Sequence, residues 1–340
     1  MERSRCGIGE RSEESTVFSR KEDLERAFWS SLPLNEVERI GNADIVVGIP
    51  FYNEAETLAD VVKITAEGLK TYFPERKCVV CCVGDAVGGD ALSVAEHVPL
   101  PAGIERVAFL LRREVSGKGW ALRAIFEIAR RLGADVAVLE ADLHPAVGGL
   151  VEEGLSPAWI RLLLEPLGIS GEKCVDFVLA SFERHWLETL ASDHFLRPLL
   201  VALFGVEIRD PLSGVFAVSN ELLERFLERK EAWVRDVCRY GVDVWLLIQA
   251  ISANTRIGEV HLGVKKHVSS PLKPSFVLRE QAKVLFEHVC EALNTRQQSL
   301  GVKETRGIEV AGRGTCSATE RVSPPTASPT QHTTHFRSGK

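Results

Sequence analysis

The stretch "GKGWALRAIFEIARRLGADVAVLEAD", residues 117–142, joins a helical pattern directly to a strand pattern. Its first part has apolar residues at helical spacing, on the side formed by Ala121, Leu122, Ile125, Ala129 and Leu132. We expect the opposite side, with Arg123, Arg130 and Arg131, to face solvent. Residues 134–142 are a short apolar run that ends in two acids, which is typical of a buried strand. A helix followed at once by a buried strand is the repeating unit of α/β proteins.

The same alternation occurs upstream. The run "ADIVVGIP" (43–50) predicts a strand, residues 53–73 have helical spacing, and "KCVVCCVGD" (77–85) predicts a second strand. Successive units of this kind form right-handed crossovers and an open, mostly parallel sheet flanked by helices. Ligands of such sheets bind beyond the carboxyl ends of the strands, so the residues that follow each strand are the candidates for a site.

Composition limits the class of protein. The chain has 340 residues, 45% of them hydrophobic and 26% charged, with a net charge of -6, which is ordinary for a globular protein. The negative balance argues against a nucleic-acid partner. The most apolar run, at 196–208, is too short to span a membrane, and the N-terminus has no apolar signal region. We therefore expect a cytoplasmic protein.

Three regions differ in composition. Residues 1–42 are polar and predict an N-terminal extension with one helix, at 20–32. Residues 43–295 carry the alternating pattern and predict a single domain. Residues 296–340 are rich in Ser, Thr, Pro and Gly, which predicts a disordered tail.

The cysteines predict core positions rather than a metal centre. Cys78, Cys81 and Cys82 lie in an apolar stretch with the pattern of a strand. Residues i and i+3 of a strand point to opposite faces, so one ion could not easily bind both sulfurs of the formal C-x-x-C. We expect small buried side chains.

The loop after the first strand, "GIPFYNEAETL" (48–58), lacks the G-x-G-x-x-G of nicotinamide and flavin enzymes. Asn53 and Glu56 have the spacing of a capping box, which predicts a helix start at Asn53. Tyr52 and Glu54 are not needed for that cap. They are candidates for a ring platform and for an acceptor of hydrogen bonds from a base or ribose.

Two further glycine-rich loops follow strands or precede helices. Asp85 in "GDAVGGDA" (84–91) is placed to accept a hydrogen bond from a nucleobase. Lys118 lies between two glycines immediately before a helix, where backbone N–H groups and an ammonium favour an anionic phosphate. The same glycines also fit a simple turn.

Carboxylates and a histidine at other strand and helix ends predict a metal site. Glu140 and Asp142 are two residues apart in the predicted strand, so they would share a face and repel each other unless a cation lies between them. Mg²⁺ or Mn²⁺ would suit them, although a solvated strand end is the alternative. Asp243 falls in the first turn of an apolar helix, and a strand within "IGEVHLGVKKHVSSP" (257–271) is expected to end in Lys265, Lys266 and His267.

The order of these parts resembles the GT-A-fold nucleotide-sugar glycosyltransferases, and most of all the glucosyl-3-phosphoglycerate synthase and mannosylglycerate synthase group. The resemblance runs from about residue 44 to about residue 293, and its most specific stretches are "PLSGVFA", "RYGVDVWLL" and "LGVKKHVSSPL". It implies a GT-A fold and a metal-dependent transfer of a sugar from a nucleotide diphosphate sugar to a small hydroxylated acceptor.

The resemblance also implies roles for individual residues. Asp142 and His267 correspond to the residues that bind Mg²⁺ or Mn²⁺, and Asp243 to the carboxylate that orients or deprotonates the acceptor hydroxyl. The positions that correspond to binding residues for the nucleotide sugar are Pro50, Tyr52, Asn53, Glu54, Asp85, Lys118, Glu140, Tyr240 and Lys265.

The sequence departs from the group where the acceptor would bind. Leu190 and Ser192 occupy the positions of the Arg and Thr of relatives that use phosphoglycerate, and Ser269 replaces an Asn. We therefore expect an acceptor such as a glycerate derivative other than 3-phosphoglycerate. Alternative polar side chains for it are Arg184, His185 and His194.

Two other functions stay open: a nucleotidyltransferase, and a protein that binds nucleotide sugars without turnover. The donor sugar, its base, the stereochemical outcome and a homodimer are left open as well.

Overall fold

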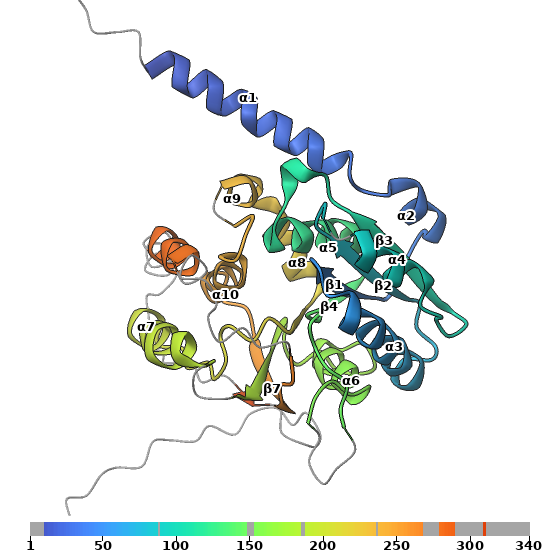
Figure 1. Ribbon diagram of the computed structural model, residues 1–340. Helices are drawn as coiled ribbons and strands as arrows, with labels where there is room; N and C mark the ends of the chain where they lie inside the picture. The colour runs from blue at the N-terminus through green and yellow to red at the C-terminus, as the bar shows by residue number, and fades with distance from the viewer. Residues whose placement is uncertain are drawn as a thin grey trace, which may run out of the picture.

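The computed structural model of the chain describes residues 10–87, 89–147, 153–184, 188–235, 237–267, 279–289 and 309–310 (Figure 1). Its strands form one sheet in the order β3-β2-β1-β4-β6-β5-β7-β8. The strands are β1 (Ile45–Phe51), β2 (Cys78–Gly84), β3 (Ile104–Leu110), β4 (Asp135–Val138), β5 (Phe177–Glu183), β6 (Phe216–Val218), β7 (Ile257–Val264) and β8 (Glu309–Val310).

The sheet is mostly parallel. Strand β6 runs antiparallel to both of its neighbours, β4 and β5, whereas the other described strand pairs are parallel. The predicted open, mostly parallel sheet flanked by helices is therefore confirmed.

Helices cover both faces of the sheet (Figure 1). They are α1 (Glu10–Trp29), α2 (Leu34–Ile40), α3 (Ala55–Tyr72), α4 (Gly89–His97), α5 (Lys118–Leu132), α6 (Ala158–Leu164), α7 (Arg197–Phe204), α8 (Asn220–Glu228), α9 (Lys230–Arg235) and α10 (Val242–Ser252). Residues 279–289 are also helical. Alternate residues of β1 face opposite ways, as the period of two in a strand requires. Ile45 and Val47 pack with α3 and α6, and Val46 packs with α5 and α10.

The cysteines of β2 are core residues. Cys78 and Cys82 belong to the cluster on one face of the sheet and Cys81 to the cluster on the other. Burial raises the pKa of the Cys82 thiol to about 12, so it stays protonated and unreactive at neutral pH. The interpretation of these residues as small core side chains is confirmed.

Helix α1 is docked on the domain through α5. The guanidinium of Arg123 donates two hydrogen bonds to the carboxylate of Glu25, at 2.8 and 2.9 Å, and lies 4.3 Å from the centre of the Phe28 ring. Arg123 is 2% exposed. The prediction that it faces solvent was wrong, because a helix outside the periodic pattern covers that side of α5. The extension also holds two helices, α1 and α2, instead of one.

Two local predictions near the site were wrong. Strand β4 ends at Val138, so Glu140 and Asp142 follow the strand rather than belong to it. Helix α3 begins at Ala55 with Glu54 as its N-cap and makes no side-chain cap bond, so Asn53 and Glu56 form no capping box.

Most of the predicted tail, 296–340, lies outside the described residues, and residues 309–310 pair with β7. Among the described helices, none has the length and apolarity that a membrane span requires.

Candidate functional site

The carboxyl ends of the parallel strands form one rim of the sheet. Because β6 runs the other way, it begins at this rim, and the loop before it meets the loops that follow β4, β5 and β7. Residues far apart in the chain come together there, as expected for a ligand site in an α/β sheet.

A chain of alternating charges crosses the rim. The ammonium of Lys118 lies 2.8 Å from Asp243 Oδ2 and 3.4 Å from Glu140 Oε1. The other oxygen of Glu140 pairs with Lys265, whose ammonium also donates to the carbonyl of Ser213 at 2.8 Å. The side chains of Lys118 and Asp243 are only 15% and 13% exposed. The structure thus brings four of the predicted site residues into one half-buried network.

The network fixes the charge of Lys118. Burial alone would lower the pKa of this ammonium, but the carboxylates of Asp243 and Glu140 outweigh burial and raise the pKa above its usual value. For Lys265 burial prevails, and together with the nearby Arg184 it lowers the pKa despite the attraction of Glu140. Lys118 is the more firmly held cation of the two.

The two glycines beside Lys118 have a packing reason. A Cβ on Gly119 would overlap the carbonyl of Val237, and one on Gly117 would lie 2.6 Å from the carbonyl oxygen of Cys238. The N–H of Trp120 donates to that same Cys238 carbonyl at 3.3 Å. The segment before α10 therefore packs against the first turn of α5 and engages the N–H of Trp120, and the binding of a phosphate by Lys118 stays a prediction.

The turn before β6 shapes the position of Glu140. Gly214 has a φ of +72°, and a Cβ there would overlap the Glu140 carboxylate. The carbonyl of Ser213, its neighbour, is the one that accepts from Lys265. The stretch "PLSGVFA" contributed to the resemblance, but no role was predicted for Gly214, because Glu140 and Gly214 are remote in the chain and no local spacing relates them.

The loop after β1 is ordered by Glu54, whose carboxylate accepts hydrogen bonds from the backbone N–H of Tyr52, at 2.6 Å, and of Asn53, at 3.0 Å. Pro50 lies inside β1, and Tyr52 is 55% exposed. The buried hydroxyl of Thr57 donates to the carbonyl of Ala141 at 2.7 Å and ties this loop to the segment that carries Glu140. The carboxylate of Glu54 is thus engaged by its own loop.

Tyr240 lies near Lys118, and Asp85 is bonded to Ser116, two residues before Lys118 in the chain. Burial raises the pKa of the Tyr240 phenol, although the neighbouring charge of Lys118 opposes this. Its backbone N–H donates to Glu280 Oε2 at 3.2 Å, a contact from residues 279–289 that sequence reasoning missed. Asp85 accepts hydrogen bonds from the N–H of Ala86, at 2.7 Å, and from the hydroxyl of Ser116.

The residues predicted to bind metal lie on adjacent stretches of backbone. Leu143 forms an antiparallel bridge with His267, and the N–H of His144 donates to the carbonyl of Lys266 at 2.9 Å. Burial and the charge of Lys265 lower the pKa of His267 to about 4, so its ring is neutral at physiological pH, the form that binds metal. Asp142 is the residue before the bridge.

The chemistry of this donor set fits Mg²⁺ or Mn²⁺. Within the described part of the chain, no group of three or more His, Cys, Asp or Glu side chains is close enough to bind an ion. Such ions commonly take only one or two protein ligands and complete their shell with substrate phosphates and water. One carboxylate and one neutral imidazole are consistent with a site of that kind, and their metal role stays a prediction.

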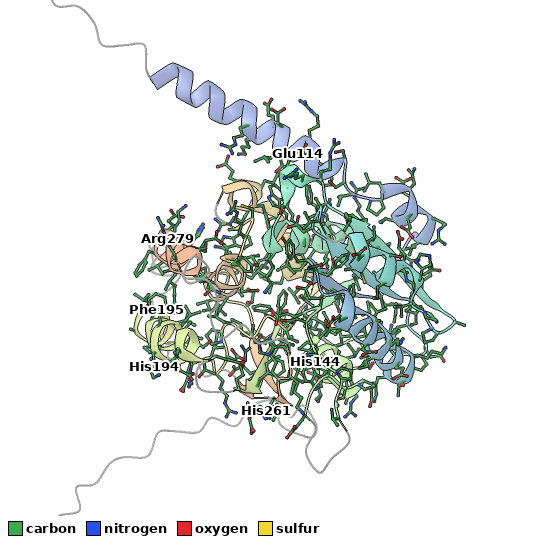
Figure 2. The ribbon with its side chains drawn as sticks, viewed as in Figure 1. Glu114, His144, His194, Phe195, His261 and Arg279 are labelled. Atoms are coloured by element: carbon green, nitrogen blue, oxygen red, sulfur yellow. The ribbon has the colours of Figure 1, made fainter. Side chains whose placement is uncertain are left out.

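An open cleft of about 530 Å³ borders His267. It is lined by His144, Pro145, Val147, Glu188, Lys265, Lys266 and His267. His194, on the π-helical turn before α7, lies on a different part of the molecule from His144 (Figure 2). Arg184 is buried and paired with Asp210 at 2.6 Å, so it is not available to an acceptor, and His185 lies outside the described residues.

Comparisons with known proteins identify the fold. No protein-family model and no curated protein matches the chain. Among solved structures it is similar to glucosyl-3-phosphoglycerate synthase from Mycobacterium tuberculosis in complex with Mg²⁺ and uridine diphosphate. The TM-score is 0.53 at 23% identity, covering 75% of this chain and 83% of that one. The chain has a GT-A fold.

Two other complexes of that synthase give the same result. The one with Mn²⁺, uridine diphosphate and glucosyl-3-phosphoglycerate has a TM-score of 0.54 at 22% identity, and the one with Mn²⁺, UDP-glucose and phosphoglyceric acid has 0.52 at 22%. Both cover 75% of this chain and 84% of the other. At this identity the likeness establishes the GT-A fold, and the activity has to be argued from the residues of the rim.

Proposed function

We propose that this GT-A protein transfers a sugar from a nucleotide diphosphate sugar to the hydroxyl of a small acceptor such as a glycerate derivative, with the help of Mg²⁺ or Mn²⁺. Two things support the proposal: the charge network at the rim, and the presence of UDP-glucose and phosphoglyceric acid in the complex of a protein with the same fold.

The observation that carries the proposal is the state of Asp243. One oxygen of its carboxylate is held by Lys118 at 2.8 Å. The other, Oδ1, is buried, and among the described residues it has no hydrogen-bond partner. A buried acceptor without a partner costs about 1–3 kcal/mol, so a hydroxyl-bearing ligand would be stabilised there. An acceptor hydroxyl that donates to Oδ1 would be oriented and could lose its proton to this carboxylate.

The cations of the network suit a leaving diphosphate. An ammonium has three donors, and among the described residues Lys118 uses two of them, on Asp243 and Glu140, so the third is open to an incoming oxygen. Lys265 likewise adds positive charge where the negative charge of the leaving group develops. The charges of Lys118 and Lys265 cancel those of Glu140 and Asp243, so the network has no net positive charge for the diphosphate. A divalent ion held by Asp142 and His267 would supply that charge.

The residues at the predicted acceptor-binding positions argue against an acceptor that carries a phosphate group. Ser192, at the position of the relatives' Thr, is buried, and Leu190, at the position of their Arg, offers no donor. Lys266, which lines the cleft, pairs with Glu153 at 2.6 Å. Glycerate or another unphosphorylated hydroxy compound is therefore the acceptor to try first.

A thermal-shift panel of UDP-glucose and GDP-mannose, with and without Mn²⁺, tests donor and metal together. We expect one donor to raise the melting temperature, and Mn²⁺ to increase that rise. Asp142→Asn should remove the metal-dependent part, whereas Asp60→Asn, in an exposed pair with Lys63 at 3.9 Å, should retain it. If both variants respond like the wild type, the metal role of Asp142 is wrong.

Turnover separates the proposed transferase from its rivals. Release of nucleoside diphosphate that depends on glycerate or a related acceptor supports the transferase. Binding of a donor without turnover by any acceptor favours a binding protein. Release of pyrophosphate from a nucleoside triphosphate and a sugar phosphate would favour a nucleotidyltransferase.

A further inference from the structure

The DPLSG turn, residues 210–214, and the residue before it, Arg209, are held by two buried ionic side chains. Arg184, just beyond β5, pairs with Asp210 at 2.6 Å, and its guanidinium also donates to the carbonyls of Leu212, at 3.4 Å, and Ser213, at 3.2 Å. Glu259 of β7 accepts the N–H of Arg209 at 2.7 Å. Arg184, which follows β5, and Glu259, in the neighbouring strand β7, thus both bind this short turn.

The turn has a defined geometry of its own. The N–H of Ser213 donates to the carbonyl of Asp210 at 3.2 Å, which closes the turn, and the Ser213 hydroxyl bonds to the backbone of Val215. These contacts fix the direction of the Ser213 carbonyl. That carbonyl accepts from Lys265, and Lys265 holds Glu140.

Burying the charged side chains of Arg184, Asp210 and Glu259 is costly in free energy. The side chains of Arg184 and Asp210 are 5% and 8% exposed, and Glu259 as a whole residue is 3% exposed. Removing such charges from water costs several kcal/mol for each, and well-packed apolar side chains would stabilise a turn at least as well. Burial raises the pKa of both Asp210 and Glu259, although Arg184 opposes this at Asp210 and the N–H of Arg209 opposes it at Glu259. A costly arrangement beside the charge network calls for a role other than stability.

We propose that Arg184 and Asp210, seated by Glu259, are positioning residues for the sugar transfer proposed above: they fix the Ser213 carbonyl so that Lys265 meets the leaving diphosphate. None of the three touches the reacting atoms. They act through the turn, and the inference about catalysis rests on the proposed function.

The decisive variant is Arg184→Met/Asp210→Leu, which removes both charges and so leaves none buried alone. We expect a melting temperature close to that of the wild type, because apolar replacement of a buried ion pair is usually neutral or stabilising. We expect kcat to fall by about 10- to 100-fold, the usual effect of losing a supporting contact. The KM for the donor should change by less than about threefold, because Lys265 acts on charge that develops during transfer.

Two single variants complete the set. Arg184→Lys retains the charge without the planar fork and should retain more of kcat than the double variant does. Arg256→Met removes a guanidinium that pairs with Asp176 at 3.4 Å at the opposite end of β5 and β7, and it should leave kcat unchanged. Each kcat is calculated per molecule of folded protein, with the folded fraction measured by near-ultraviolet circular dichroism.

Hydrogen exchange gives a readout that does not depend on turnover. Backbone amides of residues 212–215 should exchange about tenfold faster in the double variant, whereas those of α5 stay protected. A double variant with wild-type kcat, or with wild-type exchange in the turn, overturns the positioning role. A wild-type protein that transfers no sugar overturns the proposed function, and the exchange comparison still decides whether the pair holds the turn.

Discussion

The side-chain nitrogen of Lys118 lies 2.8 Å from a carboxylate oxygen of Asp243, although 125 residues separate the two in the chain. Lys118 begins α5 and Asp243 stands in the first turn of α10. An ammonium at a helix N-terminus is opposed by the helix dipole, so Lys118 depends on its carboxylate partners. This contact joins the predicted donor side of the site to the predicted acceptor side.

Lys118→Met should abolish most of the activity. The variant removes one of the two ammonium groups that would stabilise the leaving diphosphate, and it leaves Asp243 and Glu140 to repel each other. We expect kcat to fall by about 100- to 1,000-fold, the effect of removing one preorganised electrostatic contact. Steady-state kinetics measures it, with Lys173→Met, in an ion pair at the opposite end of β5, as the control. A kcat within about threefold of the wild type would contradict the assignment.

Gly214→Ala should impair activity more than its backbone strain explains. Gly214 has a φ of +72°, and a methyl group there would displace the Glu140 carboxylate. Gly133, the C-cap of α5, has the same φ of +72° and open space around it. Each Gly→Ala change should cost about 1–2 kcal/mol of folding free energy from the left-handed backbone. Only Gly214→Ala should also lower kcat, so equal activities of the two variants would count against the role of Glu140.

Arg123→Met should loosen helix α1. The substitution removes both hydrogen bonds to Glu25 and the contact with the Phe28 ring. We expect the free energy of unfolding to fall by about 2–4 kcal/mol, because breaking a buried ion pair leaves its partner uncompensated. Urea denaturation measures the loss, and proteolysis within residues 20–29 should accelerate. The control Arg39→Met, in an exposed pair with Glu105 at 3.2 Å, should cost less than about 1 kcal/mol.

Asp135→Asn should change the pH dependence of stability. Burial raises the pKa of Asp135, even though its carboxylate accepts the N–H of Asn220 at 2.8 Å. A raised folded-state pKa means that the stabilising contribution is present below the unfolded value and is lost as pH rises through the folded value. The unfolding free energy of Asp135→Asn should therefore improve relative to the wild type as pH rises from about 4 to about 8.

Glu221→Gln supplies the opposite sign for comparison. The hydrogen bond from Lys173 lowers the pKa of Glu221, so its contribution is present above the unfolded value and is lost as pH falls. Relative to the wild type this variant should be weakest at neutral pH, and the difference should shrink only below about pH 5. Parallel pH profiles for the two variants would refute the assignment of Asp135.

Strands β1, β2 and β4 were predictable because nearly all of their residues are buried, and helices α3 and α5 because they are amphipathic. Helix α5 was predicted within a residue at each end, since Gly117 and Gly133 mark its limits in the sequence. Arg123 was wrongly predicted to face solvent because the apolar periodicity of α5 identifies only the side of that helix that faces the sheet. It cannot tell that a second helix, α1, covers the polar side.

The site was predictable as a collection of residues and only partly as an arrangement. Lys118, Glu140, Asp243 and Lys265 were all candidates, but their pairing depends on contacts between loops that no spacing encodes. The grip on the DPLSG turn escaped entirely. Its signals were faint: Asp210 before the Pro-Leu pair, and Glu259 as a single acid in an apolar strand.

The Arg184–Asp210 pair also stands at the two ends of the chain segment that leads from β5 to β6. The chain segment between Arg184 and Asp210 therefore begins and ends at the same point of the rim. Insertions or deletions in the exposed part of this segment would leave Lys265 and Glu140 in place, as long as the core residues of α7, Leu200 and Phe204, keep their packing. Exchanging the exposed part of this segment between proteins with this fold would change the acceptor of the sugar and leave the donor-binding residues as they are.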